Sequence, residues 1–140
     1  MDSKVTGNLG ENIAGKFLRD KGYRILDKNY SSKFVSGPKK GEIDIIAKKD
    51  GIISFVEVKT LSDSPAYGPL LAKASDGQGR AVFNPEDKVD YQKQRKIIKT
   101  AEAWLVENKI PFNSKWQIDV VAIVIDKVSQ KAQIKHFENI

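Results

Sequence analysis

Two carboxylates and a lysine occur in a pattern that could do metal-assisted chemistry. Asp44 is followed, after a short connection, by Glu57 and Lys59, and apolar residues flank all three. Carboxylate oxygens are ligands that Mg²⁺ prefers, with waters and phosphate oxygens completing its shell. A lysine beside such an ion would orient or activate an attacking water and offset charge developing on a phosphate. We therefore predict a Mg²⁺ or Mn²⁺ site at Asp44 and Glu57, with Lys59 as the catalytic lysine.

The element that must position these residues is a β-hairpin. An Asp-Gly pair joins two β-rich runs, residues 42–47 and 52–60, which is a strong signal for a two-residue turn. That register places Asp44 opposite Glu57, and Glu42 opposite Lys59, on one face. The other face would carry only apolar side chains: Ile43, Ile45, Val56 and Val58.

Two acids facing each other on otherwise apolar strands repel and are costly to desolvate, so a compensating charge is required. A divalent cation supplies it. The alternative is an exposed ladder of Glu and Lys side chains in which Asp44 pairs with Lys59.

Glu11 is the candidate third metal ligand. Apolar residues at helical spacing predict a helix over residues 6–21, and Gly22 is a natural stop. Glu11 falls beside Leu18 at the edge of the apolar face, so it would point along the seam between helix and sheet. The alternative is an ordinary acidic residue near a helix N-terminus, where negative charge is favourable.

The remaining elements predict an α/β domain. The sequence predicts further strands over residues 23–30, 117–125 and 132–137. It also predicts a second helix, over residues 85–108, that begins at an Asn-Pro cap. Helix, three strands, a long connection, helix and two strands indicate a central mixed β-sheet of about five strands flanked by helices. A length of 140 residues favours one domain over residues 1–140.

Composition excludes several kinds of site. The chain has no Cys and one His, so disulfide frameworks, zinc ribbons, iron–sulfur clusters and thiol nucleophiles are absent. No apolar stretch approaches the roughly 20 residues of a membrane span, and residues 1–10 lack the apolar core of a signal peptide. We expect a cytoplasmic protein without a membrane partner. Its 24 Lys and Arg against 18 Asp and Glu, a net charge of +6, suggest an anionic partner such as nucleic acid.

The basic excess lies mainly in one segment. Residues 28–49 contain Lys33, Lys39 and Lys40 in or near a Ser- and Gly-rich loop, which could contact phosphates or simply aid solubility. Lys93 and Lys96 on the second helix are further candidates for phosphate contacts. Acidic residues are almost as numerous on that segment, so a solvated helix face is the alternative.

Several blocks of the chain resemble the YraN-like proteins. These are small bacterial proteins of the restriction-endonuclease-like, PD-(D/E)xK superfamily. The blocks are Gly7–Glu11, Gly22–Leu26, Asn29, Gly41–Ala47 (GEIDIIA), Phe55–Thr60 (FVEVKT), Lys93–Lys96, Ala101, Leu105 and Ile118–Val121. The combination of the GEID and FVEVK blocks at this spacing is highly specific.

The resemblance implies a fold similar to that of archaeal Holliday-junction resolvases. It also implies that Glu11, Asp44 and Glu57 are metal ligands and that Lys59 is the catalytic lysine. Asp119 matches a family position, and we interpret it as a structural strand residue paired with a base. His136 is expected at the surface, and Trp104 and Trp116 in the core or an interface.

We therefore predict a metal-dependent endonuclease that hydrolyses DNA phosphodiester bonds, in branched or single-stranded DNA. Two-fold dimers suit branched DNA, so a homodimer is expected by analogy. One alternative is a nucleic-acid-binding module that keeps the nuclease fold with little or no catalysis. Another is a structural or partner-binding protein in which the carboxylates form only a salt-bridge network.

Overall fold

The computed structural model describes residues 3–33, 41–62, 91–126 and 131–140. The elements follow the predicted order, with ends that differ by a few residues. They are α1 (Ser3–Asp20), β1 (Arg24–Ser31), β2 (Glu42–Lys49), β3 (Ile52–Ser62), α3 (Tyr91–Glu107), β4 (Lys115–Asp126) and β5 (Lys131–Phe137). The long connection and the Asn-Pro cap predicted before α3 lie outside the described residues.

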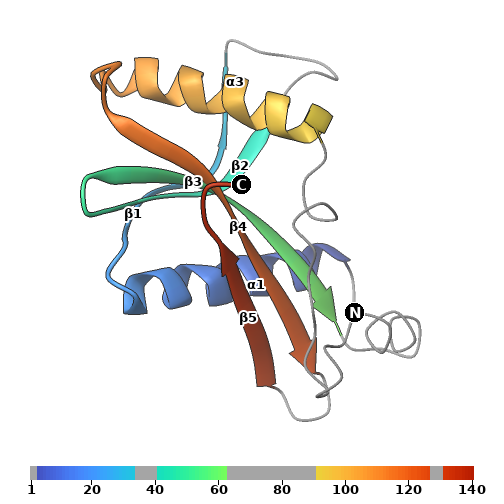
Figure 1. The fold of residues 1–140 in the computed structure, drawn as a ribbon. Helices are drawn as coiled ribbons and strands as arrows, with labels where there is room; N and C mark the ends of the chain where they lie inside the picture. Colours follow the sequence, from blue (N-terminus) through green and yellow to red (C-terminus); the bar gives the residue numbers. More distant parts are fainter. Residues whose placement is uncertain (1–2, 34–40, 63–90, 127–130) are drawn as a thin grey trace.

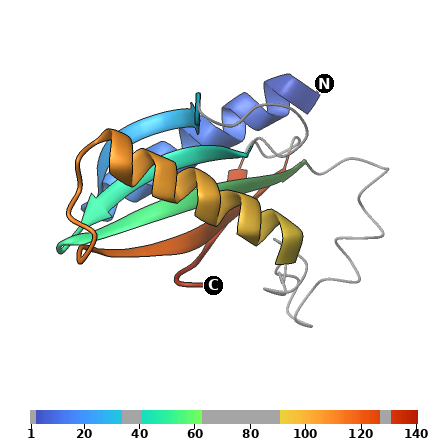
Figure 2. The ribbon, with the colours of Figure 1, turned by 90° about the horizontal axis from the view of Figure 1, so that it is seen from above.

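The five strands form one mixed sheet in the order β1-β2-β3-β4-β5. β3 and β4 run parallel, whereas the other neighbouring strands are antiparallel. α3 lies in the crossover between the parallel strands and covers one face, and α1 covers the opposite face (Figures 1 and 2). This arrangement confirms the predicted α/β, restriction-endonuclease-like fold.

Each helix encloses its own apolar cluster against the sheet. On the α3 side the two tryptophans pack edge-on against Phe55, with ring centroids at 5.8 Å for Trp104 and 5.5 Å for Trp116. Trp104 belongs to the core, as predicted, and the partly buried Trp116 packs against it. On the α1 side Ala14 and Leu18 meet the inner strands. The sheet is therefore buried on both faces, as strands of near-continuous apolar sequence require.

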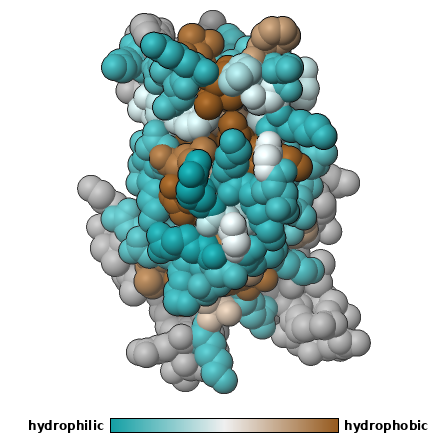
Figure 3. All heavy atoms as spheres, turned by 90° about the vertical axis from the view of Figure 1, so that its left-hand side faces the viewer, coloured by the Kyte–Doolittle hydropathy of each residue, from teal (hydrophilic) through white to brown (hydrophobic). Residues whose placement is uncertain are grey.

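The predicted hairpin is present. Asp50 and Gly51 have φ of 52° and 78°, the conformation of a type I′ turn, and the pairs run from Lys49–Ile52 to Ile45–Val56. Figure 3 shows this end of the molecule, where the surface is largely hydrophilic with small apolar patches.

Pairing between β2 and β3 ends one residue before the acids. Beyond Ile45–Val56 the strands diverge (Figure 1), so the predicted ladder pairs Asp44–Glu57 and Glu42–Lys59 do not form. β2 turns toward α3 instead: a Cβ on Gly41 would lie 2.6 Å from Thr100 Oγ1 and 3.0 Å from the Lys96 carbonyl oxygen. For the same reason Ile43 packs in the α3 cluster, whereas Ile45, Val56 and Val58 pack on the α1 side.

Two glycines shape α1: Gly22 ends the helix, and Gly10 allows it to pack closely on the sheet. Its C-terminus has the Schellman pattern, with Tyr23 N donating to Leu18 O (2.9 Å), Gly22 N donating to Arg19 O (3.0 Å) and Gly22 at φ 97°. Near its other end, a Cβ on Gly10 would collide with the Thr60 side chain. Gly10 thus lets the helix approach β3 closely. None of the helices in the described part of the chain is long and apolar enough to cross a membrane.

Replacing Gly10 with Ala should destabilise the fold by about 1–3 kcal/mol, because the new methyl group must push α1 away from Thr60. Gly15→Ala is the matched control on the same helix. Its Cβ would meet the flexible ends of two side chains, Lys28 at 3.3 Å and Arg19 at 4.0 Å, so the variant should be neutral or gain up to about 1 kcal/mol in helix propensity. Urea unfolding followed by circular dichroism measures both. Equal stability of the two variants would contradict the close packing.

Candidate active site

The site is built where β2 and β3 separate. Asp44 Oδ2 accepts a hydrogen bond of 2.8 Å from Val58 N. The Asp44 side chain on β2 thus binds the backbone of β3 just beyond the last paired residues, Ile45 and Val56. Val58 faces the α1 cluster, which leaves Glu57 on the opposite side of β3, toward α3. The carboxylate of Asp44 is thereby fixed beside that of Glu57.

A cavity of about 630 Å³ opens at this point. Its walls are formed by Glu11, Gly41, Glu42, Asp44, Glu57, Gln92, Lys93, Lys96 and Ile97. Glu11 comes from α1, and Lys93 and Lys96 come from α3, so the helices on opposite faces of the sheet both contribute to this cavity. Figure 2 shows the two helices on the two faces. The lining contains four carboxylates and two ammonium groups.

The electrostatics of Asp44 reflect this crowding. Burial, followed by the charges of Glu57, Glu11 and Glu42, raises the pKa of Asp44 to about 7, although the hydrogen bond from Val58 N–H acts in the opposite direction. The four acids therefore interact as one cluster.

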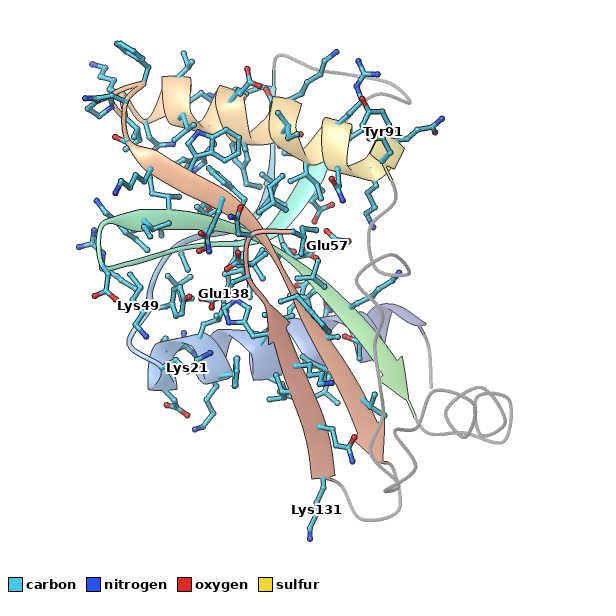
Figure 4. The ribbon with its side chains drawn as sticks, in the orientation of Figure 1. Lys21, Lys49, Glu57, Tyr91, Lys131 and Glu138 are labelled. Atoms are coloured by element: carbon cyan, nitrogen blue, oxygen red, sulfur yellow. The ribbon has the colours of Figure 1, made fainter. Side chains whose placement is uncertain are left out.

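Glu57 has a cationic partner from α3. Lys93 Nζ lies 2.6 Å from Glu57 Oε1, and the side chains are 49% and 10% exposed, respectively. In Figure 4, Glu57 points to the side of the sheet covered by α3, near the end of the helix that carries Tyr91. The structure thus supplies a compensating charge that the hairpin pattern alone did not reveal.

Glu11 has a polar partner from β1. With its amide nitrogen toward the carboxylate, Asn29 donates to Glu11 Oε1 at 3.2 Å and to Oε2 at 3.1 Å. Asn29 has a φ of 52°, a left-handed conformation that Asn adopts more readily than most residues. Glu11 therefore faces the cavity, held from the strand next to β2.

The three predicted ligands share the cavity, but they do not converge as a closed triad. Within the residues that the structure describes, three potential ligand atoms within 4.8 Å of one another occur at Asp119, His136 and Glu138, and not among Glu11, Asp44 and Glu57. The reason is that each acid has its own protein partner: Asn29 for Glu11, Val58 N for Asp44 and Lys93 for Glu57.

The other predicted residues are distributed as follows. Lys59 is half-buried on β3, two residues beyond Glu57 and on the same face of that strand, but it is not among the residues that line the cavity. Lys96 lines the cavity together with Lys93. Lys33 is exposed after the end of β1, and Lys39 and Lys40 lie outside the described residues.

A second polar cluster corrects the prediction for His136. This side chain is 3% exposed, not superficial, and its Nε2 lies 2.9 Å from Asp119 Oδ2, which confirms that Asp119 pairs with a base. Lys21 Nζ is 3.4 Å from Nδ1; since an ammonium only donates, Nδ1 accepts and Nε2–H donates to Asp119. Asp119 Oδ1 accepts from two more donors, Gln117 Nε2 and Asn139 N, both at 2.9 Å.

This cluster is a structural network. Both oxygens of the buried Asp119 are satisfied, so a metal ion at His136 Nε2 would have to break an existing bond. The contacts tie the C-terminal residues to β4. Sequence reasoning missed them because β4–β5 pairing and the return of the chain at residue 139 bring the partners together.

The raised pKa of Asp44 generates a prediction about stability. Between about pH 4 and pH 7 the folded protein keeps a proton on Asp44 that the unfolded chain has lost, so wild-type stability falls as pH rises through this interval. Asp44→Asn removes the titration and keeps an acceptor for Val58 N. At pH 8 we expect the variant to be more stable by a few kcal/mol, or roughly 5–10 °C in Tm, with the difference vanishing near pH 4.

The matched control is Asp50→Asn, which makes the same substitution in the exposed hairpin turn, away from the cavity. Thermal unfolding at half-unit steps from pH 4 to pH 8 provides the comparison. A difference between wild type and Asp44→Asn that stays constant over this range would contradict the buried position of Asp44.

Comparison with known proteins gives the family. The model of the uncharacterised protein family UPF0102 matches residues 10–123, which include the cavity residues of α1, β2, β3 and α3. The chain belongs to family UPF0102. The resemblance to the YraN-like proteins is thereby confirmed.

UPF0102 relatives match nearly the whole chain. The protein of Persephonella marina is 38% identical over 128 residues, covering 91% of this chain and 90% of the relative. That of Alkaliphilus oremlandii is 36% identical over 137 residues, covering 98% and 97%. That of Fervidobacterium nodosum is 37% identical over 142 residues, covering 99% and 83%.

Two solved structures are more distantly similar. An fdxN element excision controlling factor protein from Anabaena variabilis has 18% identity and a TM-score of 0.37, covering 93% of this chain and 98% of its own. Pyrococcus furiosus SfsA in complex with Ca²⁺ has 17% identity and a TM-score of 0.36, covering 98% and 64%. Similarity at this level has no bearing on activity.

Proposed function

We propose that this UPF0102 protein is a metal-dependent endonuclease that hydrolyses phosphodiester bonds in DNA, with branched or single-stranded DNA as its substrate class. The observation that supports this most strongly is the cavity at the β2–β3 divergence. Four carboxylates, one of them with a pKa near 7, share it with two lysines. A purely structural charge network would not need an open volume of about 630 Å³ beside its buried acids.

The donor set fits Mg²⁺ or Mn²⁺. All four acids offer hard oxygen ligands, and two carboxylates with waters and phosphate oxygens satisfy such ions. Asp44 and Glu57 would hold the ion, with Glu11 as the third ligand. The excess of negative charge in the cavity favours a divalent cation, which would lower the pKa of Asp44 by direct attraction. When bound, the ion would supply positive charge next to the reacting phosphate and a more acidic water.

The residues of the chain then have separate tasks. Asn29 keeps the Glu11 carboxylate directed at the cavity, and Val58 N–H orients Asp44. Lys59 would orient the attacking water from its position beyond Glu57. Lys96, on the wall formed by α3, would bind a phosphate oxygen and offset charge in the transition state.

Cleavage assays test the proposal. Purified protein with Mn²⁺ should cleave one or more of duplex, nicked, flap and four-way-junction DNA. Asp44→Asn and Lys59→Ala should each lower the rate at least about a hundredfold, because each removes a group that acts on the reacting phosphate. Glu102→Gln, on the exposed side of α3, is the control and should retain the wild-type rate.

The second candidate function is DNA binding without catalysis, favoured by the lysines that line the cavity. Binding of four-way-junction DNA with no cleavage in Mg²⁺ or Mn²⁺ would establish it in place of the nuclease. If calorimetry detects binding of neither metal nor DNA, both proposals are wrong. Size-exclusion chromatography with light scattering, with and without junction DNA, tests the proposed homodimer.

A further inference from the structure

Lys93 and Glu57 form an ion pair with unequal partners. The Nζ–Oε1 distance is 2.6 Å, but Glu57 is almost completely buried while about half of the Lys93 side chain is exposed. Glu57 is fixed on a central strand, whereas Lys93 extends from the first turns of α3 on a flexible stem. The pair can therefore open by movement of the lysine alone.

The Glu57 oxygen that Lys93 contacts is one that a divalent ion would use. Mg²⁺ binds carboxylate oxygens at about 2.1 Å, and an ammonium group at hydrogen-bond distance from the same oxygen would repel the ion. The lysine and the ion therefore compete for Glu57. This competition also explains why the three predicted ligands do not form a closed triad around the cavity.

The cavity offers Lys93 a second position. It is far larger than one hydrated cation needs, and Lys96, one turn further along α3, lines the same wall. A phosphodiester bound near the carboxylates would meet both ammonium groups. A lysine displaced from Glu57 would thus find an anion within the same cavity.

We infer that Lys93 exchanges between two partners: Glu57 when the site holds no metal, and a phosphate of the DNA when the metal is bound. This inference rests on the proposed nuclease function and adds an order of events to it. Metal binding displaces Lys93 and so creates the phosphate site, while the ion pair prevents the acidic cavity from repelling DNA in the absence of metal.

Titration calorimetry with Mn²⁺ alone, at pH 8, tests the first half. Lys93→Met removes the competing ammonium and should bind Mn²⁺ about tenfold more tightly than wild type. Lys96→Met removes the same charge from the same cavity, but Lys96 has no ion pair among the described residues, so its effect should be about twofold. Lys93→Arg keeps the ion pair and should resemble wild type.

Fluorescence anisotropy with labelled four-way-junction DNA in Ca²⁺, used in place of Mg²⁺ to limit turnover, tests the second half. Lys93→Met should bind this DNA at least about fivefold more weakly than wild type, and Lys93→Arg should restore binding. Thermal unfolding should show that all three variants are folded, since the substituted residues are exposed on α3.

The outcomes separate this inference from the proposed function. If wild type cleaves DNA and Lys93→Met binds Mn²⁺ no more tightly, the competition is wrong and the nuclease stands. If Lys93→Met binds Mn²⁺ more tightly but DNA equally well, Lys93 is only a counter-ion and its transfer to phosphate is wrong. If neither wild type nor Lys93→Met binds Mn²⁺, the inference and the metal-dependent function are both overturned.

Discussion

The separation of β2 from β3 at Asp44 is the constraint on which the rest of the structure depends. Up to Ile45–Val56 the two strands share an ordinary antiparallel ladder, and one residue later the Asp44 side chain takes the hydrogen bond of Val58 N. This position leaves the carboxylate partly buried, and burial is the largest cause of its raised pKa. Glu11 from α1 and Lys93 from α3 line the cavity that lies beside this divergence.

Four acids that line one cavity require compensation, and each of the three predicted ligands has a different compensating partner. Glu57 has an ammonium group, Glu11 has an amide, and Asp44 has a backbone N–H and, below about pH 7, a proton. In the proposed function, protons, lysine side chains and metal ions would be interchangeable here, because each supplies positive charge to the same oxygens. A site with such exchangeable partners would be able to accept a ligand, unlike a fixed salt-bridge network.

The cluster around Asp119 shows the contrasting case. Its acid is as deeply buried as any residue of the core, yet each oxygen already has a neutral hydrogen-bond donor and His136 is oriented by two partners. Tyr23, whose pKa is raised to about 12 chiefly by burial, donates to Glu138 at the edge of the same cluster. Figure 4 places Glu138 toward the α1 side of the molecule, away from Glu57 and the end of α3 marked by Tyr91. Satisfied polar groups of this kind fix the C-terminal residues against β4. Neither oxygen of Asp119 is left without a hydrogen-bond donor.

The sequence by itself determined the order of the elements, the mixed sheet and the register of the hairpin next to its turn. These follow from local signals: apolar periodicity, the Asp-Gly turn and the alternation of side chains along a strand. Only the tertiary structure decided that the ladder stops at Ile45, that Lys93 neutralises Glu57, that Asn29 holds Glu11 and that His136 is buried against Asp119. The reason is that each of these contacts joins residues distant along the chain, and their meeting depends on how the helices pack on a sheet that opens. Spacing along one strand can predict which charged residues need a partner. It cannot predict which residue, distant along the chain, is that partner.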